Sequence, residues 1–515
     1  MNLLAQTGYI SLYIPYIFVN DRYSAEGDNM RPTVEFLEEG LLERIVSEAI
    51  DILCKIGVEI HNKPVLEMLA DHGADVRMDN YRATLTEKII NKALVSAPSS
   101  FKLYDSMGNE AVDLSEDNVN FTPGSAAINI LDYETGKIRK PTTSDYIRYA
   151  KLMTRMDHIA SQSTAFIPAD VEAKISDSYR LFLSLLYCEK PVVTGAFTID
   201  AFEIMKDLQL AVRGSGEELA KKPLTIFSCC PTSPLKWSDV TSQNVVDCAK
   251  YMIPVEYIAM PLAGFMSPVT LVGTLVQHTA ETLSGLAISQ LTNPGTPVLY
   301  GGSPAIFDVR YETTPMGAIE TQMIDCAYNE IGKYLDLPTQ AYIGLSDAKL
   351  LDAQAGLETS IGAILAALSG INNISGPGML DFESCISLEK LVLDNQICGM
   401  TQRLIRGIVP KEDFPMIDRM EELLHEQHLL ISDHTMKYLN EEHFMPSQTI
   451  DRANRSRYEE EGGLTLNQRA HQEAEEHLAG YKKPGLADDT VKDLVRLMEE
   501  EAKKYGMDKL PEREE

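Results

Sequence analysis

Two hydrophobic spacings alternate through the middle of the chain. Between residues 119 and 408, a short apolar or β-branched run, a loop rich in Gly, Pro or Ser, and a stretch with helical periodicity recur eight times. Such short runs are typical of buried strands, and the stretches between them are typical of amphipathic helices. The predicted strands span 119–122, 158–167, 191–197, 224–229, 255–260, 297–300, 339–344 and 371–375.

The alternation of strand and helix predicts an α/β fold with a parallel sheet. Eight such units close most simply into a (β/α)₈ TIM barrel, and a doubly wound sheet is the alternative. Helical spacing predicts one helix over 272–287 and another over 316–331. The second is expected to start at Thr314 and Pro315, a capping hydroxyl followed by a proline in the first turn.

The pattern changes on both sides of the repeats. Residues 30–118 combine a helical spacing from Leu37 to Leu53 with short strand-like segments, which predicts an N-terminal α+β cap. From 409 to 515 the strand signal disappears and acidic runs increase, which predicts an acidic helical C-terminal extension. We interpret residues 1–29 as a flexible or non-native extension, because a helix-like sequence begins at Met30.

Composition excludes several classes of partner. With 76 acidic and 46 basic residues among 515, the net charge is −30, which argues against nucleic acid, whose phosphates require clustered Lys and Arg. The apolar segment from Tyr9 to Val19 contains Pro15 and is too short to span a bilayer. Eight cysteines without a C-x-x-C pair fit a reduced cytoplasmic protein that acts away from membranes.

The predicted strands end in loops where chemistry is expected, since a barrel carries its active site at the carboxyl ends of its strands. These loops are small and apolar, with aromatic residues at or near the rim. An aromatic pocket with few charges suits a quaternary ammonium group, which has no N–H donors and is held by ring faces. The candidate rings are Phe166, Phe197, Phe227, Phe265, Tyr300, Tyr311 and Tyr342. For each ring alone, packing in the core is the competing interpretation.

Other chemistries have weaker signals. The ten histidines are dispersed, and the pair Cys229-Cys230 lacks a third spaced ligand, so we expect no metal site. Lys349 follows the seventh predicted strand, where a barrel aldolase or lyase could carry a Schiff-base lysine. Its proximity to Asp347 favours a carboxylate-pairing role instead.

Several motifs together resemble the trimethylamine methyltransferase (MttB-like) family. They are SDAKLLDAQAG at 346–356, GPGML at 376–380, LVLDNQ at 391–396, and LDYETG at 131–136 with RKPT at 139–142. The resemblance runs from about residue 34 to about residue 480. It implies a (β/α)₈ barrel that docks a separate corrinoid protein over its open end and delivers a substrate methyl group to Co(I).

Founding members of the family carry pyrrolysine, which we place near residues 346–351, whereas this chain has only the twenty standard residues. A quaternary nitrogen already bears its charge and leaves as a neutral amine, so the protein need only orient the methyl group. The resemblance therefore implies a small quaternary amine substrate, such as glycine betaine or carnitine, and a corrinoid carried by the partner protein rather than bound covalently here.

The expected roles are those of binding and positioning, because the corrinoid is the nucleophile. Ser346, Asp347 and Lys349 are positioning candidates, and Arg310, Lys349, Ser346 and the backbone at Gly376 are candidates to hold a substrate carboxylate. We expect a homo-oligomer, since the long C-terminal extension could wrap a neighbouring subunit. The alternatives are a trimethylamine methyltransferase, a Schiff-base lyase or aldolase barrel, and a non-catalytic methylamine-binding relative.

Overall fold

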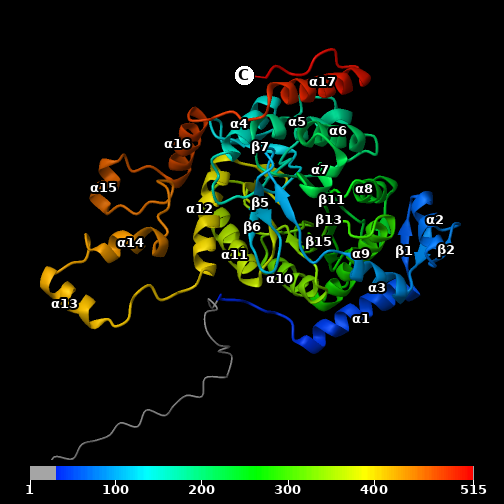
Figure 1. Cartoon of the computed structure of the whole chain (residues 1–515), viewed down its shortest axis with the longest axis horizontal. Helices are drawn as coiled ribbons and strands as arrows, with labels where there is room; N and C mark the ends of the chain where they lie inside the picture. The colour runs from blue at the N-terminus through cyan, green and yellow to red at the C-terminus, as the bar shows by residue number, and fades with distance from the viewer. Residues whose placement is uncertain (1–30, 514–515) are drawn as a thin grey trace, which may run out of the picture.

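The computed structural model describes residues 31–513, so the interpretation of residues 1–29 lies outside the described residues. Its centre holds two parallel sheets surrounded by helices (Figure 1). The five-stranded sheet has the order β15-β13-β11-β10-β9, and the three-stranded sheet has the order β17-β18-β6. Their strands are β6 (Asn120–Thr122), β9 (Gln162–Ser163), β10 (Val192–Thr194), β11 (Thr225–Cys229), β13 (Val255–Ala259), β15 (Val298–Gly302), β17 (Gln340–Ala341) and β18 (Asn373–Ser375).

Each of the eight predicted strand segments overlaps one of these strands, although β15 continues to Gly302, two residues beyond its predicted end, and this confirms an α/β fold with parallel pairing. Hydrogen bonds also run between the edges of the two sheets. Tyr300 of β15 forms a parallel bridge with Thr339, directly before β17. On the other side, the amide of Ala160, before β9, donates to the carbonyl of Phe121 on β6 at 2.9 Å.

Helices separate consecutive strands and cover the sheets. They are α4 (Thr143–Met153), α5 (Ser176–Tyr187), α6 (Ala201–Arg213), α7 (Gly216–Lys221), α8 (Asp239–Lys250), α9 (Leu271–Thr292), α10 (Ile319–Tyr334), α11 (Ala353–Ser369) and α12 (Leu388–Ile405), with a 3₁₀ turn at Ala173–Ile175. Short strands accompany the loops: β7 (Asn129–Asp132), β8 (Lys137–Arg139), β12 (Lys236–Trp237), β14 (Leu262–Ala263), β16 (Ala305–Ile306), β19 (Met379–Leu380) and β20 (Cys385–Ile386).

The predicted start of the second helix is wrong. Helix α10 begins at Ile319, after Ala318, and not at Thr314 and Pro315. The amides of Met316 and Gly317 each donate to the Asp347 carboxylate at 2.9 Å. In a helix starting at Pro315, these amides would belong to the first turn and would have no partner within the helix. Asp347 binds them instead, and the helix starts only after Gly317.

The N-terminal segment contains α1 (Glu39–Lys55), β1 (Val58–Ile60), α2 (Lys63–Asp71), β2 (Asp75–Arg77), β3 (Arg82–Thr84), α3 (Glu87–Ser96), β4 (Lys102–Tyr104) and β5 (Glu110–Asp113). Helices α1 and α3 pack on α9. The β4–β5 hairpin places Leu103, Val112 and Leu114 against Val193 and Leu299 of the sheet. This apolar cluster covers the amino ends of the strands, so any site between the sheets must lie toward their carboxyl ends.

The chain after α12 is helical, with α13 (Ile417–Glu426), α14 (Asp433–Glu442), α15 (Arg455–Glu460), α16 (Leu466–Ala479) and α17 (Asp488–Lys504). Helix α16 packs on α12, and α17 packs on α5 and α6. In contrast, α13, α14 and α15 stand away from the body (Figure 1), and α13 has no buried residue. Within residues 31–513, no helix is long and apolar enough to cross a bilayer.

Candidate functional site

A buried carboxyl group lies between the two sheets. Glu256 of β13 has no exposed surface, although it stands in an otherwise apolar strand. Its carboxylate accepts a hydrogen bond from the Ser228 hydroxyl of β11 at 2.6 Å and from the Asn373 amide of β18 at 3.5 Å. Because β13 and β18 belong to different sheets, the contact with Asn373 places Glu256 in the space that both sheets face.

A second carboxyl group approaches from the loops at the carboxyl ends. Glu383, in the turn between β19 and β20, accepts a hydrogen bond from the Ser125 amide at 3.1 Å. The Ser125 hydroxyl forms a 2.9 Å hydrogen bond with the hydroxyl of Tyr342, which follows β17. A Cβ atom at Gly124 would stand 2.7 Å from the Glu383 carboxylate, so only glycine lets the backbone approach it.

Burial keeps protons on these groups. It raises the pKa of Glu256 from 4.5 to about 7, because the charged form loses its hydration. Burial, assisted by the charge of Glu256, raises the pKa of Glu383 to about 8. Burial followed by the charges of the two glutamates raises the pKa of Cys230 to about 12 and the pKa of Tyr342 well above 10. Both carboxyls therefore titrate near neutral pH, and the thiol and phenol stay neutral.

Three buried polar atoms beside this cluster have no hydrogen-bond partner. They are the hydroxyls of Thr122 and Ser375 and the amide nitrogen of Gln340. Ser375 lies two residues beyond Asn373 on β18, so its side chain projects from the same face of the sheet. Thr122 and Gln340 are register partners of Ser375 and Asn373, respectively, and share that face. The unpartnered atoms therefore project into the space that contains Glu256, which is typical of a site for a ligand.

Glu383 is carried on a strained backbone. Asp381, Phe382 and Glu383 have φ values of 50°, 56° and 67°, three consecutive left-handed residues without a glycine. Each costs about 1–2 kcal/mol relative to a right-handed conformation. Such strain persists only where surrounding contacts impose it, and it is concentrated at functional sites.

The predicted positioning residues supply some of those contacts. The Lys349 ammonium pairs with the Asp381 carboxylate at 3.1 Å and lies 3.7 Å from the centre of the Phe382 ring. Ser346 donates from its backbone amide to Met379, and its hydroxyl donates to Glu358 of α11 at 2.6 Å. The loop that contains Ser346 and Lys349 therefore holds the strained turn, and the structure shows no contact between either side chain and Glu256.

Asp347 faces away from the two glutamates and toward the start of α10. It accepts the hydrogen bonds from Met316 and Gly317 described above. Burial, with a contribution from the charge of Glu358, raises its pKa to about 6. Asp347 therefore fixes the loop before α10.

Most predicted aromatic residues do not come together. Phe166 packs against tyrosines of α4, Phe227 packs against a phenylalanine of α6, and the Tyr300 hydroxyl donates to a threonine of α9 at 2.8 Å. These three rings are buried between strands and helices, as the competing interpretation of each ring anticipated. Only Tyr342, of all the candidate rings, has a recorded contact with the carboxyl cluster, through its hydroxyl and Ser125. The structure therefore does not form the expected cage from these rings.

The remaining rings lie on the surface of the loops. Phe197 is exposed beside Arg180, and Phe265 is 63% exposed and stacks on Phe307 at 4.8 Å. Tyr311 is 73% exposed, next to Arg310. These rings present apolar surface to solvent at the carboxyl ends of β10, β13 and β15.

The two other candidates for holding a carboxylate also have structural roles. The Arg310 guanidinium is exposed and pairs with Asp308 at 2.6 Å. A Cβ atom at Gly376 would lie 2.2 Å from the Ile343 carbonyl. Glycine is therefore needed where the segment after β18 packs against the segment after β17. Neither Arg310 nor Lys349 is therefore a free cation facing Glu256 or Glu383.

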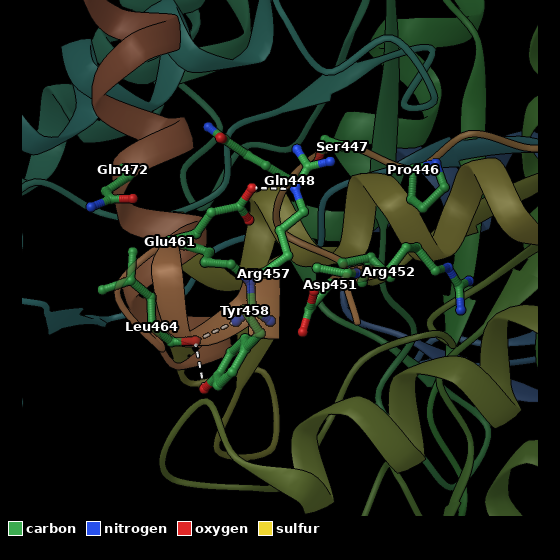
Figure 2. A pocket seen from close by; sticks show the side chains of 13 residues that line it. Pro446, Ser447, Gln448, Asp451, Arg452, Arg457, Tyr458, Glu461, Leu464 and Gln472 are labelled. Carbon is green, nitrogen blue, oxygen red and sulfur yellow. Dashed lines mark hydrogen bonds and ion pairs between the residues drawn. The ribbon is translucent and has the colours of Figure 1, made fainter. Parts of the chain in front are cut away.

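A cavity of about 510 Å³ lies in the C-terminal helical segment, between α15 and α16. Figure 2 shows that Arg457 and Glu461 pair with each other there, and that Tyr458 donates to the carbonyl of Leu464. Arg469, which also lines the cavity, donates to the backbone carbonyl of Thr449, and no strand contributes to the lining. Within residues 31–513, no group of three or more His, Cys, Asp or Glu residues is arranged to hold a metal ion.

Sequence reasoning missed Glu256, Glu383 and their partners Ser228 and Asn373. A signal was available for Glu256, because a lone carboxylate inside an apolar strand requires an explanation such as a functional site. Glu383 had no such signal, since an acidic residue in a loop is ordinarily solvated.

The chain belongs to the trimethylamine methyltransferase family. The family model, described as trimethylamine methyltransferase (MTTB), matches residues 21–506. The chain is 28% identical over 466 residues to trimethylamine methyltransferase MttB of Desulfitobacterium hafniense (strain DSM 10664 / DCB-2), a match that covers 90% of this chain and 94% of that protein. It is 30% identical over 461 residues to trimethylamine methyltransferase MttB of Methanosarcina thermophila, with 88% and 94% covered.

A relative with a different name is equally similar. The glycine betaine methyltransferase of Desulfitobacterium hafniense (strain Y51) is 28% identical over 477 residues, covering 92% of this chain and 98% of that protein. Among solved structures, the monomethylamine methyltransferase of Methanosarcina barkeri matches with a TM-score of 0.47 and 11% identity, covering 87% and 88% of the two chains. Relatives of similar identity to this chain are therefore named for two different methylated amines, trimethylamine and glycine betaine.

Proposed function

We propose that this protein transfers a methyl group from a methylated amine to the Co(I) of a separate corrinoid protein. The observation that carries the proposal is the family match over residues 21–506, together with relatives named as methyltransferases of trimethylamine and of glycine betaine. The buried polar cluster around Glu256 and Glu383 supports it, because it lies where an α/β protein with parallel strands binds its substrate.

We infer that the two sheets form one (β/α)₈ barrel. The strands follow one another in chain order around both sheets, and backbone hydrogen bonds link β15 with the segment before β17 and β6 with the segment before β9. The hairpin β4–β5 would then close the amino end, leaving the carboxyl end open to substrate and partner.

The reaction requires little acid–base chemistry when the nitrogen is quaternary. The methyl carbon exchanges its bond to nitrogen for a bond to cobalt, whose electron pair forms the new bond. The nitrogen keeps the electron pair of the broken bond and leaves as a neutral tertiary amine. The protein must hold the ammonium group and align one methyl group, which lowers the barrier by removing orientational freedom.

We propose a quaternary amine as the substrate class, because its leaving group is a neutral amine and because this chain lacks pyrrolysine. Trimethylamine is the second candidate, because relatives named for it are equally similar to the chain. A trimethylammonium ion would leave as dimethylamine while retaining its N–H proton, so it needs a partner for that N–H. A carboxylate at Glu256 or Glu383 could accept that hydrogen bond.

The corrinoid protein is expected to dock over the carboxyl ends of the strands. Exposed apolar side chains gather on those loops, and such patches are typical of protein interfaces. They are Phe197, Phe265, Val269, Val309, Tyr311 and Leu350. The aromatic residues predicted to bind substrate would, on this proposal, contact the partner instead.

We further propose a homo-oligomer in the cytoplasm. Helix α13 exposes Ile417, Met420 and Leu424 on one side and has no buried residue, so a neighbouring subunit could cover it. All eight cysteines are free, as expected in a reducing compartment.

The test of the function is direct. Purified protein, mixed with a Co(I) corrinoid protein and one methylated amine at a time, should convert the cobalt spectrum to that of methyl-Co(III). Absence of conversion with every quaternary and tertiary methylamine would refute the proposal. Binding of an amine without conversion would favour the non-catalytic alternative.

The lyase alternative predicts a covalent adduct at Lys349 after borohydride treatment. The structure offers little support for it, since the ammonium of Lys349 is held by the carboxylate of Asp381 and by the ring of Phe382. A Schiff-base lysine needs a free amine that can attack a carbonyl group, and the nitrogen of Lys349 is already engaged by these two partners.

A further inference from the structure

We propose that Glu256 and Glu383 together act as the counter-ion of the substrate's ammonium group, so that the site selects methylated ammonium ions that carry no carboxylate. This inference rests on the proposed function, in which a methylated amine is the substrate. It names a substrate class different from the betaines and carnitine that the sequence suggested. Tetramethylammonium and choline are examples of the favoured class.

The first support is geometric. Glu256 comes from β13 and Glu383 from the turn after β19, and both reach the interior through contacts with Ser228, Asn373 and Ser125. The two carboxyls lie within electrostatic range of each other, because the charge of Glu256 helps to raise the pKa of Glu383. Two adjacent buried carboxylates repel each other unless a proton or a cation lies between them.

The second support is the lack of a protein cation. Among the ion pairs recorded for residues 31–513, none involves Glu256 or Glu383. The ionisable groups whose pKa responds to the charge of Glu256 are Cys229, Cys230, Tyr328 and Tyr342 beside Glu383 itself, and burial raises the pKa of all four, so they are neutral. When the two carboxyls ionise, a positively charged ligand is therefore the remaining source of charge balance.

The third support is the set of unpartnered polar atoms. The hydroxyls of Thr122 and Ser375 and the amide of Gln340 are buried and lack partners while projecting toward the same interior. These atoms indicate that the cluster is completed by something other than the protein. Glu256 and Glu383 favour a positively charged ligand, and the three polar atoms can form hydrogen bonds beside it.

The strained turn supports a role for Glu383 beyond packing. Three left-handed residues, Asp381 to Glu383, aim this carboxyl inward, and the contacts of Lys349 with Asp381 and Phe382 hold the turn. A solvent-facing glutamate would not require such a backbone. The same contacts occupy Lys349, which was the nearest candidate to bind a substrate carboxylate.

A betaine would bring its own carboxylate to this acidic pair. Its charge would repel Glu256 and Glu383, and within residues 31–513 no Arg or Lys lowers the pKa of either glutamate or pairs with it to compensate. Like charges placed together in this way provide specificity by repulsion as well as by attraction.

The experiment measures binding by calorimetry at pH 8, with tetramethylammonium chloride, choline chloride and glycine betaine as separate ligands. Wild-type protein should bind the two cations at least about tenfold more tightly than the betaine. Glu256→Gln and Glu383→Gln should each weaken cation binding by about 10- to 100-fold, as expected for loss of a partly ionised charge about 5 Å away. Glu383→Asp, which keeps the charge, should retain more affinity than Glu383→Gln.

Glu473→Gln is the matched control, because Glu473 is also a buried carboxyl with hydroxyl partners, Ser447 and Thr449, but lies on α16. Its cation affinity should equal that of the wild type. Circular dichroism confirms that each variant is folded before binding is measured.

Equal or tighter binding of glycine betaine by the wild type would overturn the inference, as would unchanged cation binding in both glutamine variants. Failure to bind any methylated ammonium ion would overturn it too. The outcome for the proposed function is separate. Betaine-dependent methylation of cobalt would preserve the function and refute this inference, whereas selective cation binding without methylation would preserve the inference and refute the function.

Discussion

The raised pKa of Glu256 predicts a specific dependence of stability on pH. The perturbation is Glu256→Gln, which keeps the shape of the side chain and cannot ionise. Because burial raises the pKa from 4.5 in the unfolded chain to about 7 in the folded protein, the folded state holds its proton more tightly. The stability that this proton contributes is fully present below pH 4.5 and is lost as the pH rises through 7.

The size of the effect follows from the two pKa values. Their difference of about 2.5 corresponds to about 3 kcal/mol, at about 1.4 kcal/mol for each pKa unit. Glu256 has no exposed surface, so solvent does not screen the effect. For a chain of this length, with an unfolding entropy of about 1 kcal/mol/K, this free energy shifts the melting temperature by about 3 °C.

The assay compares the melting temperatures of wild type and Glu256→Gln at pH 5, 6, 7 and 8. The difference, variant minus wild type, should increase by about 3 °C between pH 5 and pH 8. Glu473→Gln should not show this rise, because hydrogen bonds from His477, Ser447 and Thr449 outweigh burial and lower the pKa of Glu473. A difference for Glu256→Gln that stays constant with pH would refute the reasoning.

Three further predictions test other parts of the structure. Lys390→Met should destabilise the protein by about 3–5 kcal/mol, seen as a lower melting temperature, because it leaves the fully buried Asp394 without its ion partner. Adding Asp394→Leu should recover much of the loss, and no recovery would argue against the pair. Leu424→Asp on the exposed face of α13 should lower the oligomeric mass measured by light scattering, with the melting temperature of the dilute protein unchanged. Phe265→Ala should raise the corrinoid-protein concentration needed for half-maximal methylation by several-fold and leave tetramethylammonium binding unaltered.

The sequence by itself determined the order and position of the secondary structure. All eight predicted strand segments overlap a strand, and the helices predicted over 272–287 and 316–331 correspond to α9 and α10. These elements can be predicted because burial of one face of a helix or strand imposes a periodic pattern of apolar residues on its own sequence. That pattern is a local property of the chain. Motifs spread along the chain also identified the family.

Only the tertiary structure decided which side chains share a site. A parallel strand covered by helices is buried on both faces, so an aromatic residue in it can point inward or outward with the same local pattern. Tyr300 packs outward on α9, whereas Glu256, on the neighbouring strand, reaches Asn373 across the interior. Glu383 reaches that interior only because distant residues hold a left-handed turn. Contacts between segments that are distant in the sequence leave no periodic signal, and such contacts bring the two carboxyls into the same interior.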